Sequence, residues 1–177
     1  MSLVTLKDGV LAADCSVVTP REKGFNMSAK VDKVHVSECG RVAFAGVGMT
    51  IGKEFASILG EIIVDDILQS EGPRRPTVKS LHDKFFTSNT PATDFTVFVV
   101  TKDGAWVLCH AEYTLLNTET PNAIGTGHWA AIVYMGEGFS AEGAIERVSR
   151  IDHTVSEDRS YIKQRSLKKM KYLGVSA

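Results

Sequence analysis

The sequence opens with Met1-Ser2-Leu3-Val4-Thr5-Leu6-Lys7-Asp8-Gly9-Val10-Leu11-Ala12-Ala13-Asp14, and this stretch decides the predicted fold. Two nearly continuous apolar runs, 3–6 and 10–13, flank an Asp-Gly pair, which is a strong short-range signal for a hairpin turn. Apolar runs without polar alternation are typical of strands that are buried on both faces. We therefore predict a buried β-hairpin that begins beside Ser2 and ends at Asp14.

The two ends of this hairpin also carry candidate chemistry. Removal of Met1 would leave Ser2 with a free α-amine beside its own hydroxyl, and a weak hydroxyl nucleophile needs such a base nearby. With the turn at residues 7–9, an antiparallel register places Ser2 roughly opposite Asp14. The residues alone therefore predict a hydroxyl and a carboxylate close together.

Composition limits the classes of protein to consider. The chain has 177 residues, of which 44% are hydrophobic and 23% charged, as in a single globular domain with its own core. Its formal net charge of −1 gives no argument for nucleic acid or a membrane surface as a partner. No signal peptide is visible, and no apolar run approaches the roughly 18 residues of a membrane span. We predict one domain over residues 1–177, with a short basic tail from about residue 163, in the cytoplasm.

Cysteine and histidine spacing gives no sign of a metal or cofactor. The three cysteines are far apart and include no C-x-x-C pair, so neither a disulfide framework nor a zinc site is indicated. The five histidines lack a metal-binding spacing. We expect no metal and no cofactor.

Periodicity along the rest of the chain predicts alternating groups of strands and helices. The predicted strands cover 33–37, 42–46, 95–100, 105–109 and 161–162, in addition to the first hairpin. Helices are predicted from Ile51 to near Gly72-Pro73, over 78–85, from near Gly127, and after a capping Ser140. The stretches 19–28 and 117–125 are predicted as loops because they contain Pro and Gly. This order predicts an α+β fold, a four-layer αββα sandwich in which helices cover two stacked antiparallel sheets.

Several segments resemble a known family in their order and spacing. These segments are residues 7–14, 31–34, 43–46, 123–127 and 140–145. They are similar to proteasome β-type subunits and their bacterial relatives, and most similar to the proteasome-like proteins that phages and prophages encode. The resemblance covers roughly the first fifty residues and a block from about 123 to 153. It implies the fold of the N-terminal-nucleophile (Ntn) hydrolases.

The resemblance implies a role for six residues. Ser2 matches the nucleophile, which is a threonine in the family, and Lys33 and Asp14 match the lysine and aspartate beside it. A positive charge on Lys33 would favour the deprotonated hydroxyl, and Asp14 would keep Lys33 charged. Gly46 matches the glycine whose N–H serves the oxyanion hole. Thr126 matches a serine that contacts the terminal amine, and Asp152 matches the supporting aspartate.

Alternatives remain open at two of these positions. Lys30 competes with Lys33, because the match over residues 19–28 is loose. The family follows its supporting aspartate with a hydroxyl residue and two glycines, whereas this sequence continues with residues 153–157 as His-Thr-Val-Ser-Glu. Ser156 could supply the missing hydroxyl from a shifted loop, and Asp158 is the alternative to Asp152.

Two functional hypotheses follow. The first is a proteasome-like Ntn hydrolase that cleaves peptide or amide bonds through Ser2 after Met1 is removed, assembled as a homo-oligomer, with a ring expected by analogy. The second is a catalytically inactive Ntn-fold protein of a phage, with a structural or assembly role and virion components as partners. A phage protein would reside in the host cytoplasm or in the virion.

Overall fold

The computed structural model describes residues 2–21, 24–47, 60–61, 63–64, 96–109 and 112–169. Its central sheet has the order β10-β1-β2-β11, built from β1 (Leu3–Lys7), β2 (Val10–Asp14), β10 (Asn122–Gly125) and β11 (Arg159–Lys163), all antiparallel. β1 and β2 form the predicted hairpin. Asp8 and Gly9 make its two-residue turn with φ of 50° and 67°, the backbone that suits the twist of the flanking strands. The strands are buried on both faces, as the apolar runs predict.

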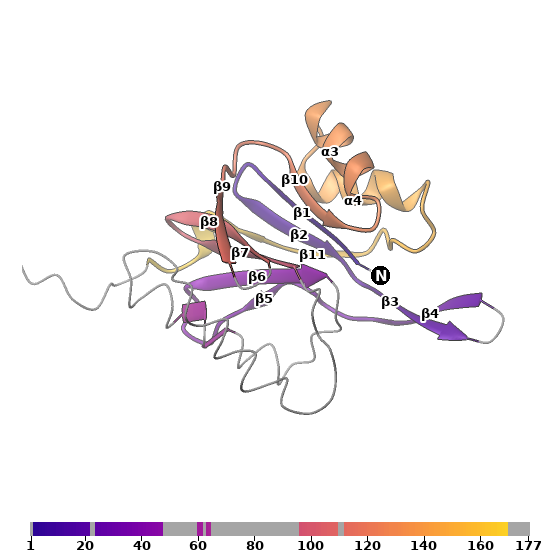
Figure 1. Ribbon diagram of the computed structural model, residues 1–177, viewed down its shortest axis with the longest axis horizontal. Coiled ribbons are helices and arrows are strands. Elements are labelled where there is room, and N and C mark those ends of the chain that lie inside the picture. Colours follow the sequence, from indigo (N-terminus) through magenta and orange to yellow (C-terminus); the bar gives the residue numbers. More distant parts are fainter. Residues whose placement is uncertain are drawn as a thin grey trace, which may run out of the picture.

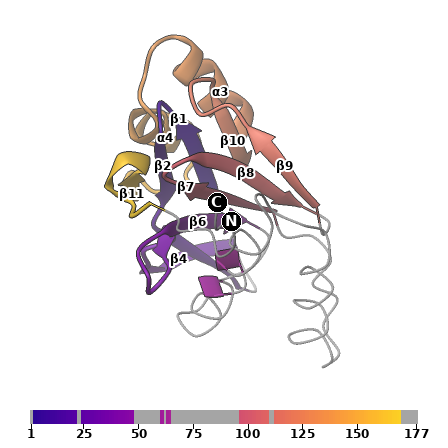
Figure 2. The ribbon, with the colours of Figure 1, turned by 90° about the vertical axis from the view of Figure 1, so that its left-hand side faces the viewer.

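A second antiparallel sheet packs face to face on the first. Its order is β5 (His35–Val36), β6 (Val42–Val47), β7 (Thr96–Thr101), β8 (Gly104–Cys109) and β9 (Glu112–Leu116). Val4, Leu6 and Leu11 of the first sheet meet Ala43 and Phe98 of the second in one buried cluster. Figures 1 and 2 show β6 and β7 on the side of β1 and β2 that faces away from the helices. The predicted α+β architecture with two stacked antiparallel sheets is confirmed.

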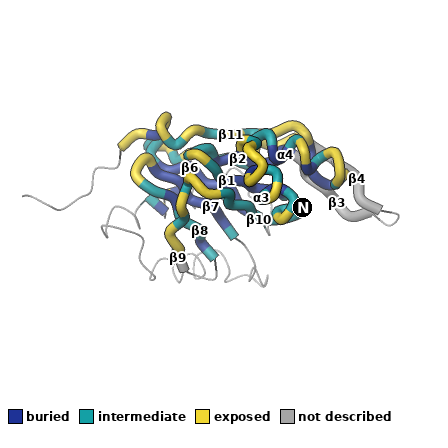
Figure 3. Tube along the Cα trace, turned by 90° about the horizontal axis from the view of Figure 1, so that it is seen from above, coloured by how far each residue is buried: buried dark blue, intermediate teal, exposed yellow. Residues whose placement is uncertain are grey.

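Two helices, α3 (His128–Gly136) and α4 (Ala141–Ser149), cover the outer face of the first sheet (Figure 1). Their buried sides turn toward β1 and β2, and their outer sides are exposed (Figure 3). α4 begins at Ser140, whose Oγ accepts a hydrogen bond from the N–H of Gly143 at 3.1 Å, as the sequence predicts. A short 3-10 helix, η1 (Gln164–Ser166), follows β11.

The opposite face of the second sheet is contacted by a helical segment. Residues 60–61 and 63–64 are helical, and a Cβ placed on Gly60 would lie 3.3 Å from the Phe44 ring. These residues belong to the helix predicted from Ile51 to near Gly72-Pro73. The rest of that helix, and the helix predicted over 78–85, lie outside the described residues. Among the described residues, no helix is long and apolar enough to cross a membrane.

The predicted loop over 19–28 is wrong. The chain instead forms a hairpin of β3 (Ser16–Arg21) and β4 (Gly24–Lys30), which extends away from the two sheets (Figure 1). Pro20 suggested a loop because proline cannot donate to a strand ladder. Both strands of a two-stranded ribbon are edge strands, however, and an edge strand tolerates proline.

The predicted loop over 117–125 is wrong in part. β9 ends just before it, and β10 occupies residues 122–125, where it pairs with β1. The strand segment is only four residues long and ends in a glycine, so local sequence gave it little strand signal. Its pairing depends on the exposed edge of β1, which is remote in sequence.

Candidate active site

The β1–β2 hairpin brings Ser2 and Asp14 to the same end of the first sheet. The register pairs Val4 with Ala13, so Leu3 rather than Ser2 lies opposite Asp14. The N–H of Leu3 donates to Asp14 Oδ1 at 2.9 Å. The predicted pairing of Ser2 with Asp14 is therefore displaced by one residue, because the turn uses two residues instead of three. Asp14 is fully buried, so its carboxylate depends on hydrogen-bond and charge partners to offset the cost of burial.

Lys33 joins the two groups. Its Nζ lies 3.0 Å from Ser2 Oγ and 3.0 Å from Asp14 Oδ1, and its side chain is 14% exposed. This ion pair offsets part of the free-energy cost of burying the Asp14 carboxylate. The structure thus brings Ser2, Asp14 and Lys33 into direct contact, from two ends of a hairpin and from the segment that follows β4.

Lys30, the alternative to Lys33, has a different partner. Its side chain is exposed and forms an ion pair with Asp158. That contact raises the pKa of Lys30 above its ordinary value, chiefly through the hydrogen bond to the Asp158 carboxylate. Lys30 and Asp158 therefore form a surface pair, and neither has a described contact with Ser2.

The turn at residues 125–127 holds the backbone of Ser2. The N–H of Thr126 donates to the Ser2 carbonyl at 2.9 Å, and Gly125 pairs with Leu3. Gly125 has a φ of 93°, and a Cβ on it would lie 1.9 Å from the Ser2 carbonyl oxygen. Only glycine fits this position. Thr126 therefore contacts Ser2 through its main chain.

Gly46 lies near the end of β6, one residue before Val47. The backbone N–H and C=O of Val42 point toward the β5 side. The carbonyl accepts from the N–H of Ser37 at 2.8 Å, and the N–H donates to Ser37 Oγ at 3.1 Å. Strand alternation then directs the N–H of Gly46 to the same side of β6, at a position beyond the last residue that β5 pairs with. The ladder between β5 and β6 begins at His35 and does not extend to Gly46, whereas the next residue, Val47, has its Cγ1 2.8 Å from where a Cβ on Gly125 would be. The Gly46 N–H is thus directed away from β7, near the end of β6 that contacts the 125–127 turn.

Asp152 lies beside the 125–127 turn and makes no described contact with Ser2. Its Oδ2 lies 4.0 Å from where a Cβ on Gly127 would be. Its Oδ1 accepts from the hydroxyl of Thr154 at 2.6 Å and from the Thr154 N–H at 2.9 Å. The hydrogen bond from the Thr154 hydroxyl is the main reason that the pKa of Asp152 lies below its ordinary value, against the opposing effect of burial.

The hydroxyl beside Asp152 comes from Thr154, which is not among the predicted site residues. Ser156, the predicted alternative source, accepts instead at its Oγ from the N–H of Asp158 at 3.1 Å. The signal for Thr154 was present as an Asp-x-Thr pattern at the end of a helical stretch, in which a side chain two residues on can return to the carboxylate.

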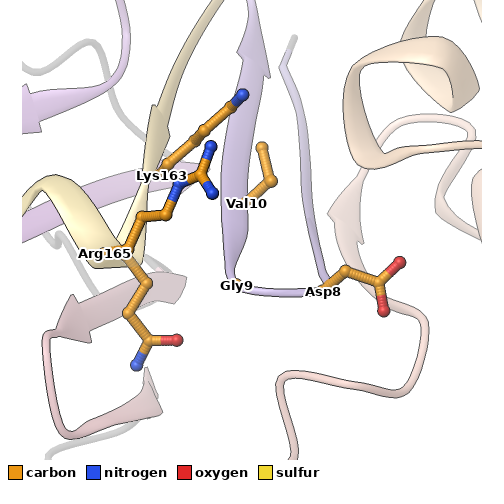
Figure 4. Close-up of a pocket in the computed structure, with 6 residues that line it drawn as sticks. Asp8, Gly9, Val10, Lys163 and Arg165 are labelled. Carbon is orange, nitrogen blue, oxygen red and sulfur yellow. The ribbon is translucent and has the colours of Figure 1, made fainter.

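Other features of the described residues lie apart from this cluster. Burial raises the pKa of the Cys15 thiol, which makes it a poor nucleophile. The described residues contain no group of three or more His, Cys, Asp or Glu side chains that could hold a metal ion. A cavity of about 340 Å³ lies at the turn end of the hairpin, about 20 Å from Ser2 along β1. Figure 4 shows that it is lined by Asp8, Gly9, Val10, Lys163, Gln164 and Arg165.

The fold is similar to those of solved proteasome-like structures. BPH of Thiobacillus denitrificans superposes with a TM-score of 0.58 at 13% identity, over 92% of this chain and 96% of that one. Eukaryotic HslV from Trypanosoma brucei gives 0.56 at 16% identity, over 92% and 99%. BPH in complex with epoxomicin gives 0.56 at 13% identity, over 92% and 97%. No protein-family model and no curated protein sequence matches the chain. The chain therefore has the proteasome-like Ntn-hydrolase fold.

Proposed function

We propose that this protein is a proteasome-like Ntn hydrolase that cleaves peptide or amide bonds through Ser2, after Met1 has been removed. The observation that carries this proposal is the position of Lys33 Nζ, 3.0 Å from both Ser2 Oγ and Asp14 Oδ1. The fold supports this proposal, because Ser2, Lys33 and Asp14 meet at the end of the β1–β2 hairpin. Met1 itself lies outside the described residues.

The proton of the attacking hydroxyl needs an acceptor. Lys33 Nζ forms an ion pair with Asp14 and donates a hydrogen bond to Ser2 Oγ, so it meets the hydroxyl as a donor and not as an acceptor of its proton. Among the described side chains, Lys33 is the one that contacts Ser2 Oγ, and no histidine does. The α-amine of Ser2, free once Met1 is removed, is the remaining base and would accept the proton directly or through a water.

The reaction then proceeds by acyl transfer. Ser2 Oγ adds to the substrate carbonyl, and the positive charge of Lys33 stabilises the oxygen as it loses its proton. The N–H of Gly46 would donate to the oxyanion of the tetrahedral intermediate. Collapse breaks the C–N bond, the amine leaves with the proton taken from Ser2, and water hydrolyses the resulting ester.

The remaining residues of the cluster would position the terminal amine. The 125–127 turn fixes the Ser2 backbone through the Thr126 N–H, and Asp152, held by Thr154, lies against the same turn. An ionised carboxylate at this place would favour the orientation of an amine hydrogen toward it. We propose a homo-oligomer as the working form, for which the similarity to HslV gives weak support, and the cytoplasm as its location.

The first test is whether Ser2 carries a free amine and reacts. Intact-mass spectrometry of the purified protein should show loss of the initiator methionine. Epoxomicin, which is bound in one of the similar structures, should add one equivalent of covalent mass. A fluorogenic peptide should be cleaved, and Ser2→Ala should lower kcat/KM by at least about 10³-fold.

Two further variants make the outcome specific. Ser2→Thr restores the residue type that the resemblance implies and should keep both activity and epoxomicin addition. Ser166→Ala removes an exposed hydroxyl outside the cluster and should change neither. Retention of Met1 in protein that cleaves the peptide, or unaltered cleavage by Ser2→Ala, would overturn the proposal. Retained Met1 without any cleavage would support the inactive Ntn-fold alternative.

A further inference from the structure

Ser160 occupies an unusual place for a polar residue. β11 exposes Arg159, Tyr161 and Lys163, and it turns Ser160 and Ile162 inward. Ile162 packs against the hydrophobic cluster between the two sheets. An apolar side chain is the ordinary occupant of such an inward position. Ser160 places a hydroxyl at the neighbouring inward position. This hydroxyl needs polar partners, because burying it without them would be unfavourable.

The partners of Ser160 are the backbone N–H groups of Lys33 and Val34. Both donate to Ser160 Oγ at 3.2 Å. Residues 31–34 have no strand assignment, so these N–H groups have no regular ladder to donate to and depend on this acceptor. The hydroxyl also acts on Cys15: a hydrogen bond with Ser160 partly offsets the effect of burial on the pKa of the Cys15 thiol. The two acceptor positions and the single donor of the hydroxyl are thereby all used.

The same strand also fixes the position of Asp14. β11 pairs with β2 in a register that places Arg159 opposite Asp14 and Ser160 opposite Ala13. Ser160 therefore links the backbone of Lys33 to the strand pair that carries the carboxylate which Lys33 must reach. A lysine side chain is long and flexible, so a fixed backbone is the first requirement for holding its ammonium between two oxygens.

We infer that Ser160 is a positioning residue for Lys33, which sets the ammonium between Ser2 and Asp14 by accepting the N–H groups of Lys33 and Val34. The inference rests on the proposed function for its catalytic consequence, but the position of the ammonium can be measured without any activity. Ser160 acts through Lys33 and makes no described contact with Ser2 itself.

The test compares Ser160→Ala, Ser160→Cys and Ser160→Thr with the parent protein. Threonine retains the acceptor oxygen, whereas alanine removes it and cysteine replaces it by a weak acceptor of similar size. Ser160→Ala and Ser160→Cys should lower kcat by about 10- to 100-fold with KM changed by less than about twofold, since a displacement of about 1 Å can cost 10²-fold. Ser160→Thr should recover most of kcat.

A spectroscopic readout separates positioning from activity. In protein labelled with ¹⁵N-lysine, the Lys33 ammonium resonance is identified by its loss in Lys33→Met. That resonance should shift or broaden in Ser160→Ala and Ser160→Cys, and stay in place in Ser160→Thr and in the control Ser166→Ala. If the Ala variant fails to fold, the Cys variant decides the outcome.

Two results would overturn the inference. One is an unchanged ammonium resonance in a folded Ser160→Cys or Ser160→Ala protein. The other is an active parent enzyme in which these variants keep the parent kcat. If the parent shows no hydrolysis, the proposed function fails, while a shift of the ammonium resonance would still support the positioning role.

Discussion

At the scale of single residues, the cluster depends on one buried charge being matched by another. Asp14 is fully buried, and Lys33 is 14% exposed on its side chain. Each charge alone would be unfavourable there, so their mutual distance of 3.0 Å is what makes both tolerable. The pair leaves Lys33 Nζ with donor capacity to spare for Ser2 Oγ, which is how a stability feature can also serve chemistry.

A double-mutant cycle on this pair should be strongly non-additive. Asp14→Asn keeps an acceptor for the N–H of Leu3 but leaves Lys33 without its counter-charge, so we expect a loss of about 3–5 kcal/mol in the free energy of unfolding. Lys33→Met removes the ammonium that pairs with the buried Asp14 carboxylate and should also destabilise. The double variant should cost less than Asp14→Asn alone, because no unmatched charge remains. Denaturant unfolding measures all three, and additive losses would contradict the buried-pair interpretation.

The Asp152 carboxylate gives a second prediction at this scale. The Thr154 hydroxyl donates to it at 2.6 Å and is the main cause of its lowered pKa. Thr154→Val keeps the shape and removes this donor, so the pKa of Asp152 should rise toward its ordinary value. Thr154→Ser should leave it low. Carboxyl ¹³C NMR titration measures the change, and equal pKa values in the Val and Ser variants would show that the backbone N–H alone is responsible.

Local chemistry and the resemblance are enough to predict Ser2, Asp14 and Lys33, and Lys33 contacts the other two in the structure. They do not decide between Lys33 and Lys30, because two nearby lysines carry the same charge. They do not predict Ser160 or Thr154. Ser160 acts on a segment more than a hundred residues away, and the use of Thr154 depends on the shape of its loop.

At the scale of elements, connections with strong local signals were predicted and those set by distant partners were not. The Asp8-Gly9 turn and the Ser140 cap are determined by residues within the same short segment. β10 forms because the edge of β1 accepts it, and β3 with β4 form despite Pro20. The first predicted helix is confirmed as helical at residues 60–61 and 63–64, which are its described residues.

The β10–α3 connection gives a prediction with an internal control. Gly125 and Gly138 have similar positive φ values of 93° and 103°, so alanine is strained at both. At Gly138 a Cβ meets nothing within 4 Å, whereas at Gly125 it would lie 1.9 Å from the Ser2 carbonyl oxygen. Gly138→Ala should cost about 1–2 kcal/mol of unfolding free energy. Gly125→Ala should cost clearly more and abolish the reaction of Ser2 with epoxomicin; equal costs with retained labelling would contradict the close approach.

At the scale of the whole molecule, the two stacked sheets supply rigidity and one set of helices fixes the outer face of the first sheet. The candidate site lies at one end of the stack, where the N-terminal segment, the 31–34 segment and the 125–127 turn meet. Three distant parts of the chain therefore have to fold together before Ser2, Lys33 and Asp14 can meet. Sequence alone predicted the layers but could not predict this convergence except through resemblance.

The stability of the whole fold should fall in mild acid because of His35. This histidine lies on β5, half-buried, with its ring centroid 5.5 Å from that of Phe44, and burial lowers its pKa below the ordinary value of 6.5 despite the opposing charge of Asp32. The unfolded chain then binds a proton at a higher pH than the folded chain does. The resulting contribution to stability is complete above about pH 6.5 and is lost as the pH falls through the folded pKa.

Denaturant unfolding between pH 7.5 and 5 should show this decline, and His35→Gln should flatten it. His153→Gln, at an exposed position, should leave the decline in place. An equal slope in the parent and in His35→Gln would show that other groups govern the acid sensitivity.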